Sequence, residues 1–377
     1  MKILELTHFS SGVCGVWQRV KQESQLLSQH GYEVTIFSSN ATKGSNELAK
    51  QEDFLKNNIK IKRFPFIKLG GESFMSWRFE KEALAFEPDI IIAHVYRHLH
   101  TTRALKVSEK LRKKGKNCKV FLVTHAPFIE DNFTRSIISK IFVNVYDKII
   151  TPYLINKFDK IISITKWELP YLLNLGIKKE KIVYIPNGIP QEFFKLKKIS
   201  KTKKNNILFL GRISPIKNLE LIINSLKNIK TLNLDIVGPY EKNYKRILDT
   251  LIKKSKLKGH INFLLPIYDL SKKINLIDNY NIFILPSKRE AMPQSLIEAM
   301  ARGKIVISSN TQGGKEIIEN NKNGFLFDLE VEDSLIKSLE KTINLTSIQK
   351  SKIQKNAIKT AEKFKWNLLI KNLEKLF

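Results

Sequence analysis

Short apolar runs alternate with longer amphipathic stretches along the first half of the chain. Runs without polar alternation are typical of buried parallel strands. Residues 16–30 between the first two runs have a helical pattern that ends before Gly31, a common residue just past a helix. The order strand, helix, strand predicts an α/β fold with a parallel sheet. The predicted strands are Lys2–Leu6, Glu33–Ser38, Asp89–Ala93, Lys119–Thr124, Lys160–Thr165 and Lys181–Ile185.

A second series of the same kind follows the polar, basic stretch 195–206 (KLKKISKTKKNN). Its predicted strands are Ile207–Leu210, Leu234–Val237, Ile261–Phe263, Ile282–Leu285 and Ile305–Ser308. Helical patterns between them cover Leu219–Lys227, Tyr244–Lys256 and Gln294–Ala301. We therefore predict two Rossmann-like domains, residues 1–194 and 195–365, with parallel sheets that face a ligand cleft between the domains.

Composition supports a globular protein and adds one unusual feature, a large positive charge. Of 377 residues, 42% are hydrophobic and 27% charged, which excludes a disordered or collagen-like chain. The 65 Lys and Arg exceed the 36 Asp and Glu, giving a net charge of +29. Such an excess is typical of proteins that meet nucleic acid, a membrane surface or an acidic ligand. The two cysteines, the lack of a signal peptide and the lack of a long apolar stretch favour a reduced, cytoplasmic location.

Residues 286–298 (PSKREAMPQSLIE) carry two glutamates eight positions apart. Pro293 fits the first turn of a helix, so Glu290 is predicted in the preceding loop and Glu298 on the helix. Such a turn lets two carboxylates reach one ligand, and it directs free N–H groups toward a phosphate. Taken alone, the segment also fits a solvated glutamate followed by an ordinary helix.

Three further segments place polar groups at strand ends. Arg212 and Lys217 follow the strand 207–210, and two cations on one loop suit a diphosphate. His125 follows another strand and could donate hydrogen bonds or exchange protons, although a structural role is as plausible; His94 is a weaker candidate. The loop 10–15 (SSGVCG) matches neither GxGxxG nor a Walker A sequence. Without an HExxH, CxxC or DxD pattern, no metal site is indicated.

Together, the segments resemble glycosyltransferase family 4, which has the GT-B fold. The family's E-x7-E signature matches Glu290 to Glu298, and its GR-x4-K motif matches Gly211, Arg212 and Lys217. Further matches extend over nearly the whole chain: Ile185–Ile189 (IPNGI), 30–34 (HGYEV), Gly313–Gly314 with Glu316 one position out of the usual spacing, Asn323–Phe327 (NGFLF) and Phe364–Trp366 (FKW). Two departures are Cys14 in place of a glycine, and Asn218 after the motif lysine.

The resemblance implies a retaining hexosyl transfer from a nucleotide sugar, UDP- or GDP-linked, without a metal or other cofactor. Arg212 and Lys217 would hold the donor diphosphate and stabilise the charge on the leaving nucleotide. Glu290 would contact hydroxyls of the transferred sugar, and Glu298 would accept hydrogen bonds from the ribose.

The remaining implied site residues come from both predicted domains. His125 would lie near the sugar and orient it or stabilise charge. Gly15 would let the backbone approach a donor phosphate without a Cβ in the way. The donor site would also include Ala291, Met292 and Pro293. The final helix, 366–377, would pack back on the N-terminal domain.

Two other functions remain open at this point. One is a different GT-B sugar-nucleotide enzyme, such as an epimerase or a phosphorylase. The other is a nucleic-acid-binding protein, motivated only by the charge; the chain has no zinc-finger, helix-turn-helix or aromatic-interleaved basic motif, so we expect no nucleic-acid partner.

The acceptor is expected to be a lipid-linked glycan, a glycolipid or a surface polysaccharide precursor. The basic region 97–119 and the apolar, cationic segment 133–160 would then contact anionic lipid at the cytoplasmic face of a membrane. The alternative is a soluble enzyme with a cytosolic acceptor. The donor base and sugar, the linkage and the oligomeric state do not follow from residue types.

Overall fold

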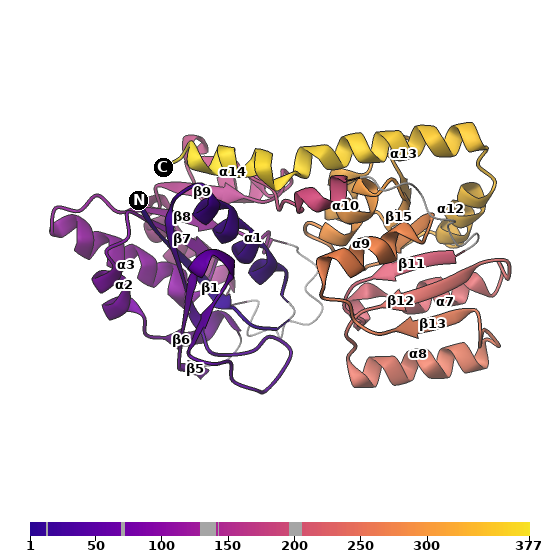
Figure 1. Cartoon of the computed structure of the whole chain (residues 1–377), viewed down its shortest axis with the longest axis horizontal. Coiled ribbons are helices and arrows are strands. Elements are labelled where there is room, and N and C mark those ends of the chain that lie inside the picture. The colour runs from indigo at the N-terminus through magenta and orange to yellow at the C-terminus, as the bar shows by residue number, and fades with distance from the viewer. Residues whose placement is uncertain (13, 69–71, 129–140, 142, 196–205) are drawn as a thin grey trace. The chain divides into compact units, whose positions relative to one another are not determined.

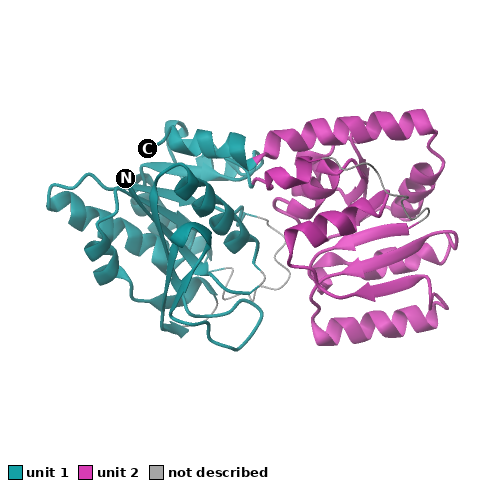
Figure 2. Cartoon of the chain, in the orientation of Figure 1, with its two compact units in different colours: residues 1–187, 366–377 teal, residues 188–365 magenta. Residues whose placement is uncertain are grey.

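The chain forms two compact units. The structure, a computed structural model, describes residues 1–12, 14–68, 72–128, 141, 143–195 and 206–377 (Figure 1). Unit 1 comprises Met1–Asn187 and Trp366–Phe377, and unit 2 comprises Gly188–Lys365 (Figure 2). Most of the expected linker, 196–205, lies outside the described residues.

The division falls before the boundary expected after residue 194, because residues 188–194 make their contacts within unit 2. Gln294 Nε2 donates a hydrogen bond to the Gly188 carbonyl (3.3 Å). Arg302 Nη1 donates to the carbonyl of Phe193 (2.9 Å), whose ring is fully buried. The change in composition at residue 195 therefore comes later in the chain than the change of unit.

Unit 1 is built on an eight-stranded sheet in the order β10-β9-β8-β7-β1-β2-β4-β3, parallel except for the β3–β4 pair. Its strands are β1 (Lys2–Phe9), β2 (Glu33–Ser39), β3 (Glu52–Phe54), β4 (Lys60–Phe64), β7 (Ile90–His94), β8 (Lys119–Val123), β9 (Lys160–Ser163) and β10 (Ile182–Tyr184). A separate antiparallel hairpin joins β5 (Phe66–Lys68) and β6 (Met75–Trp77). The helices are α1 (Gly15–Gln29), α2 (Glu80–Phe86), α3 (Leu99–Lys113), α5 (Thr151–Leu154), α6 (Leu169–Asn174) and α14 (Trp366–Glu374).

The central strands of unit 1 are buried over almost their whole length, as expected of a parallel sheet covered on both faces. In β1 only Lys2 is partly exposed, and every residue of β7 is buried. Four of these buried positions are polar, namely Glu5, Thr7 and His8 in β1 and His94 at the end of β7. Because a buried charge needs partners, the carboxylate of Glu5 requires hydrogen-bond partners within unit 1.

Unit 2 contains a six-stranded, fully parallel sheet in the order β13-β12-β11-β14-β15-β16. Its strands are β11 (Asn206–Leu210), β12 (Asn233–Val237), β13 (Ile261–Leu264), β14 (Ile282–Leu285), β15 (Ile305–Ser309) and β16 (Phe325–Phe327). Its helices are α7 (Leu219–Leu226), α8 (Lys242–Lys254), α9 (Leu270–Asp278), α10 (Gln294–Ala301), α11 (Gln312–Ile317), α12 (Ser334–Ile343) and α13 (Ser347–Ala361). The loops after β11 and β14 lie at the same edge, where parallel sheets bind ligands.

Every strand predicted from an apolar run is present, with ends that differ by no more than three residues. The sequence did not predict β4, in which charged residues alternate with apolar ones, or the three-residue strand β16. It also missed the hairpin of β5 and β6. Short or strongly polar strands depend on their sheet neighbours more than on their own pattern.

The last helix, α14, packs within unit 1. Trp366 is buried, and its indole N–H donates a hydrogen bond to Gln22 Oε1 of α1 (2.5 Å). The Arg19 guanidinium lies over the same ring, 5.4 Å from its centroid. Arg19 also donates to the carbonyl of Ile185 and to Asn187 Oδ1, so it holds both places where the chain leaves or re-enters unit 1.

Candidate active site

In unit 2, the loop after β11 is held against the loop after β12. The Gly211 N–H donates to the Val237 carbonyl (3.0 Å). A Cβ on Gly238 would lie 1.9 Å from the Gly211 oxygen, so only glycine permits this contact. The close approach fixes the backbone from which Arg212 and Lys217 extend.

Lys217 and Glu290, 73 positions apart in the chain, form an ion pair. Lys217 ends the short 3-10 turn Pro215–Lys217, and its Nζ lies 2.6 Å from Glu290 Oε1. The same oxygen accepts a hydrogen bond from the Ser287 hydroxyl (2.6 Å). The Lys288 N–H donates to the Ile216 carbonyl (2.8 Å), which ties the two loops together through their backbones. The structure therefore brings the GR-x4-K and E-x7-E motifs into contact.

Gly313 packs against the backbone of the loop that carries Glu290. The Gly313 N–H donates to the Glu290 carbonyl (3.0 Å). A Cβ on Gly313 would lie 2.6 Å from the Ala291 oxygen and 2.8 Å from the Glu290 oxygen. Gly314 is equally constrained, because its Cβ would lie 2.5 Å from the Ser309 oxygen. Gly313 thus supports the Glu290 loop directly, and Gly314 packs against the end of β15.

Glu298 lies on α10, as predicted, and has a partner that the sequence did not indicate. Lys273 of α9 places its Nζ 2.6 Å from Oε1 and 2.5 Å from Oε2 of this carboxylate. Pro293 is the residue before the first turn of α10, and Met292 is buried beside it. The pairing of Lys273 with Glu298 depends on the packing of two helices, so no local sequence motif predicts it.

Arg212 is the most exposed of the predicted donor-site cations. Half of its side chain is accessible, and its guanidinium lies 3.8 Å from Glu241, which is equally exposed. A surface pair of this kind contributes little to stability. The Arg212 fork is therefore available for a ligand at low cost.

The two other predicted site residues, Gly15 and His125, belong to unit 1. Gly15 is the first residue of α1, and apart from its chain neighbours no residue that the structure describes has an atom within 4 Å of a Cβ built there. His125 follows β8 with a positive φ of 60°. Glu168 holds the backbone on both sides of it, because its Oε1 accepts hydrogen bonds from the Thr124 hydroxyl (2.5 Å) and the Ala126 N–H (2.8 Å). This anchoring maintains a conformation that non-glycine residues rarely adopt.

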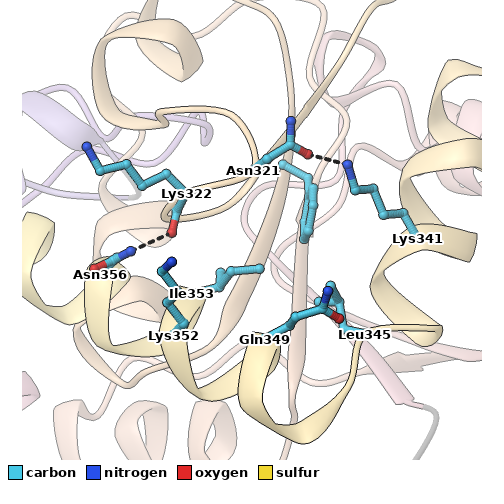
Figure 3. A pocket seen from close by; sticks show the side chains of 9 residues that line it. Asn321, Lys322, Lys341, Leu345, Gln349, Lys352, Ile353 and Asn356 are labelled. Carbon is cyan, nitrogen blue, oxygen red and sulfur yellow. Dashed lines mark hydrogen bonds between the residues drawn. The ribbon is translucent and has the colours of Figure 1, made fainter.

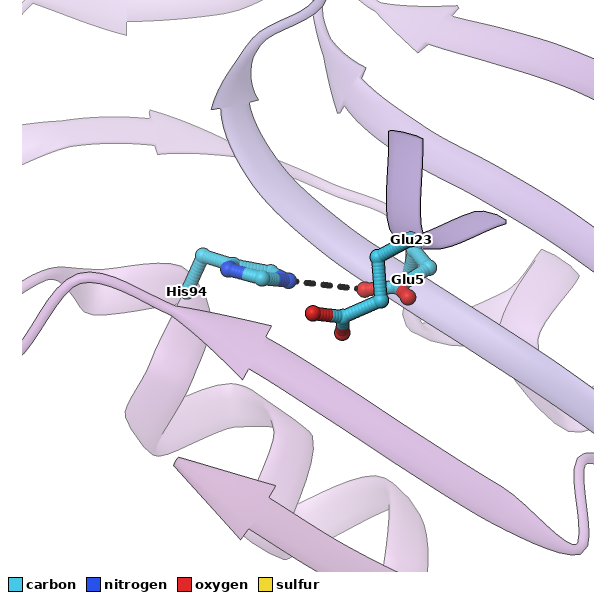
Figure 4. Close-up of side chains that lie close together, drawn as sticks. All are labelled: Glu5, Glu23 and His94. Carbon is cyan, nitrogen blue, oxygen red and sulfur yellow. Dashed lines mark hydrogen bonds and ion pairs between the residues drawn. The ribbon is translucent and has the colours of Figure 1, made fainter. Parts of the chain in front are cut away.

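His125 is also the outer member of a buried polar cluster. His94 Nδ1 lies 3.0 Å from His125 Nε2, and His94 Nε2 lies 2.7 Å from Glu5 Oε2. Figure 4 shows the carboxylates of Glu5 and Glu23 close to the ring of His94. One carboxylate oxygen of each glutamate and one ring nitrogen of His94 lie within 4.8 Å of one another. Arg19 pairs with Glu23 at 3.0 Å. The sequence identified His125 and His94 but gave no sign of the two buried glutamates.

Burial governs the ionisation of this cluster. It raises the pKa of Glu5 to about 8 and that of Glu23 to about 7, although Arg19 opposes both shifts. It lowers the pKa of His94 to about 3 and that of His125 well below its ordinary value. Both imidazoles are therefore neutral at physiological pH.

A pocket of about 460 Å³ lies elsewhere in unit 2 (Figure 3). It is lined by Asn321, Lys322, Phe325, Lys341, Leu345, Gln349, Lys352, Ile353 and Asn356. Lys341 Nζ donates to Asn321 Oδ1, and Asn356 Nδ2 donates to the Lys322 carbonyl. The pocket shares no residue with the predicted donor site.

Comparison with known proteins follows the same division of the chain. The family of glycosyl transferases group 1 matches residues 190–363, and Glycosyltransferase Family 4 matches residues 13–193. An uncharacterized glycosyltransferase of Methanocaldococcus jannaschii is 25% identical over 96% of this chain and 94% of its own length. The UDP-Gal:alpha-D-GlcNAc-diphosphoundecaprenol alpha-1,3-galactosyltransferase of Escherichia coli is 29% identical over 46% of this chain and 49% of its own.

Solved structures of the same fold cover the whole chain. Sucrose-phosphate synthase from Thermosynechococcus elongatus superimposes with a TM-score of 0.78 at 16% identity, covering 100% of this chain and 98% of its own. HepE of Anabaena in complex with UDP gives a TM-score of 0.76 at 18% identity, with 100% and 99% covered. These likenesses establish the GT-B architecture of the two α/β units. The matches over both halves show that the chain belongs to glycosyltransferase family 4 and is a nucleotide-sugar-dependent glycosyltransferase of the GT-B fold.

Proposed function

We propose that the enzyme is a retaining glycosyltransferase whose donor site is the motif cluster of unit 2. In the reaction, the bond between the anomeric carbon and the donor diphosphate breaks, and an acceptor oxygen bonds to that carbon with the same anomeric configuration. The contact between Lys217 and Glu290 carries the proposal, because it joins a cation suited to a diphosphate with a carboxylate suited to sugar hydroxyls at 2.6 Å.

Arg212 and Lys217 hold the diphosphate and stabilise the negative charge that grows on the leaving nucleotide. Their preorganised cations supply the electrostatic stabilisation that dominates such reactions. Glu290 accepts hydrogen bonds from the transferred sugar, and Glu298, held by Lys273, accepts them from the ribose. The short loop of Ala291, Met292 and Pro293 lines the donor site between these two carboxylates.

In unit 1, Gly15 leaves room for a donor phosphate at the start of α1, because no atom of the described, non-neighbouring residues lies within 4 Å of the position that a Cβ would occupy. His125 donates a hydrogen bond to the transferred sugar. Because its ring is neutral, it orients the sugar through hydrogen bonding rather than through a full charge.

The test combines donor identification with product stereochemistry. A true donor raises the melting temperature by mass action, so a thermal-shift screen of UDP- and GDP-sugars identifies it; the UDP-Gal-dependent relative favours UDP. The anomeric coupling constant of the product, measured by NMR, then reports the configuration. A product with inverted configuration would contradict the retaining mechanism.

Metal independence is a separate part of the proposal. Arg212 and Lys217 supply the positive charge that other transferases obtain from a divalent ion. Activity is therefore expected to survive EDTA treatment and desalting. Complete loss on chelation, with recovery on addition of Mg²⁺ or Mn²⁺, would contradict this assignment.

We further propose a lipid-linked acceptor, reached by contact of unit 1 with a membrane surface. Four large apolar side chains spaced four residues apart, Ile141, Val145, Ile149 and Tyr153, are between 45% and 76% exposed. Side chains at this spacing share one side of a helix, and part of this stretch is helical. An exposed apolar row is typical of an interfacial helix.

The charge near this row is smaller than the sequence indicated. Of the basic residues in 97–119, several are used within the fold: Arg97 pairs with Asp147, Arg112 with Asp159, and Lys119 donates to the carbonyls of Leu376 and Phe377. Exposed lysines on and just after α3 are Lys106, Lys110, Lys113 and Lys114. Lys113 pairs with Glu109, and the other three lie at a spacing of four residues. Residues 133–140 and 142 of the apolar segment lie outside the described residues.

Flotation with liposomes tests the membrane contact. Within the described ranges, no helix has the length and apolar character needed to cross a bilayer. Binding to anionic vesicles is expected at low salt, and Ile149→Ser with Tyr153→Ser should weaken it at every salt concentration. Lys106→Gln with Lys110→Gln should weaken it mainly at low salt, since exposed charges are screened. Absence of binding at low salt would contradict the membrane contact and leave the donor site untouched.

A further inference from the structure

We propose that Glu5 and His94 are positioning residues that determine which ring nitrogen of His125 carries its proton. The consequence for the sugar rests on the proposed function, whereas the hydrogen-bonded path itself does not. The path consists of two contacts, from Glu5 Oε2 to His94 Nε2 (2.7 Å) and from His94 Nδ1 to His125 Nε2 (3.0 Å).

The fold places these three residues in line. Glu5 lies on β1, His94 ends β7, and His125 follows β8, and these strands are neighbours in the sheet order β8-β7-β1. His94 is held from behind as well, because His100 Nε2 lies 2.8 Å from its carbonyl oxygen. Both nitrogens of the His94 ring are thus engaged, one toward the buried carboxylate and one toward His125.

Two proton arrangements satisfy the path, and they differ by one proton. In the first, Glu5 is ionised and accepts from His94 Nε2–H, His94 Nδ1 accepts from His125 Nε2–H, and His125 Nδ1 carries a lone pair. In the second, one proton has entered at His125 Nδ1, the His125 Nε2 proton has passed to His94 Nδ1, and the His94 Nε2 proton has passed to Glu5. Both imidazoles are neutral in each arrangement, and Glu5 holds the added proton.

Electrostatics of the surroundings agree with this assignment. Burial raises the pKa of Glu5 to about 8 and strongly disfavours a charged His94, so the carboxyl group is the member of the path that titrates near neutral pH. From α1, Arg19 and Glu23 face the carboxyl end, and Arg19 favours the ionised form of Glu5. From the segment before α3, His98 is the further titratable group near His125.

The outer nitrogen of His125 therefore changes its hydrogen-bonding role with pH. When Glu5 is protonated, His125 presents Nδ1–H, a donor that suits a sugar oxygen. When Glu5 is ionised, the same nitrogen is an acceptor. Glu5 and His94 thus act on the substrate through His125, although both are fully buried.

The experiment is a pH titration of the histidine ring nitrogens by ¹⁵N NMR. The chain has seven histidines. The ring ¹⁵N signals that disappear in His125→Gln are assigned to His125. The expected result is a change from Nδ1–H to Nε2–H in the wild-type protein as pH rises, with a midpoint near 8. The same tautomer from pH 6 to pH 10 would overturn the proposal without any variant at Glu5.

Two variants separate Glu5 from its neighbour. Glu5→Gln is nearly isosteric and cannot titrate, so His125 should keep one tautomer at every pH. Glu23→Gln is the matched control and should retain the change, because Glu5 and the two histidines of the path are intact in this variant. Retention of the change in Glu5→Gln, or its loss in Glu23→Gln, would show that Glu5 does not end the path.

The readout also separates this inference from the proposed function. If the tautomer changes as expected but His125→Ala transfers sugar at the wild-type rate, the path stands and the role of His125 in transfer is wrong. If His125→Ala is inactive and the wild-type ring never changes tautomer, the role stands and the path is wrong. If both the hydrogen-bonded path and the role of His125 are confirmed, kcat of the wild-type enzyme should change with pH near pH 8. This change should be absent in Glu5→Gln.

Discussion

The contact between Gly313 and the Glu290 loop allows a sharp test of the donor site. In Gly313→Ala the new methyl group would lie 2.6 Å from the Ala291 oxygen and 2.8 Å from the Glu290 oxygen. Both neighbours are backbone atoms, which cannot rotate away as a flexible side chain can. The loop must therefore retreat by about half an ångström, because packed interiors do not compress.

The size of the effect follows from this displacement. A shift of about 1 Å at a reacting group can cost roughly 10²-fold in rate, so half of that distance predicts a roughly tenfold lower kcat/KM. Overpacking also costs about 1–3 kcal/mol of stability. At roughly 2–4 °C per kcal/mol for a unit of this size, the melting temperature should fall by several degrees.

A second glycine provides the control. In Gly324→Ala the methyl group would lie 2.6 Å from Val306 Cγ2 and 3.0 Å from the Val306 carbonyl oxygen, a clash within unit 2 that does not touch the Glu290 loop. Steady-state kinetics and melting curves of both variants decide the question. We expect a lower melting temperature in both and a loss of kcat/KM only in Gly313→Ala. Equal kcat/KM in the two variants would refute the reasoning.

Three further results are expected. Lys217→Met and Glu290→Gln should each lower kcat by about 10²–10³-fold, the usual loss of one preorganised electrostatic contact, with melting temperatures close to wild type; wild-type kinetics in either would remove that residue from the site. Gly15→Ala should fold normally and raise the KM for the donor, and an unchanged KM would show that no phosphate approaches there. The pKa of Glu5 is higher in the folded state, about 8, than its ordinary 4.5, so the folded state binds more protons between these values. The unfolding free energy should therefore fall as pH rises through this range, and less so in Glu5→Gln, as measured by urea denaturation at pH 5 and pH 9.

The parallel strands could be predicted because each is a short apolar run that must be buried on both faces. Leu208–Leu210 and Ile282–Leu285 are examples in which composition alone decides the element. Pro293 similarly indicated the start of the helix that separates Glu290, in the loop, from Glu298 on α10. By contrast, β16 consists of three residues and becomes a strand through its pairing with β15.

The partners of the site residues could not be predicted, because they come from distant elements. Nothing near Glu298 in the sequence points to Lys273, and nothing in the strand Lys2–Phe9 shows that Glu5 is buried against His94. The structure also buries Glu23 against Arg19, a pairing that the sequence pattern did not indicate. His94, the weaker candidate in the sequence, is the central residue of the buried path.

The ion pair between Lys217 and Glu290 has a consequence for selectivity among phosphate-bearing molecules. The carboxylate already neutralises the lysine, so the loop that carries Lys217 attracts anions less than its residue types indicate. An inorganic phosphate ion must compete with Glu290 for Lys217, and it leaves the partly buried carboxylate without a replacement partner. A nucleotide sugar brings phosphate oxygens to the lysine and hydroxyl groups to the glutamate at the same time. The pair therefore favours the binding of ligands that carry both a phosphate and sugar hydroxyl groups.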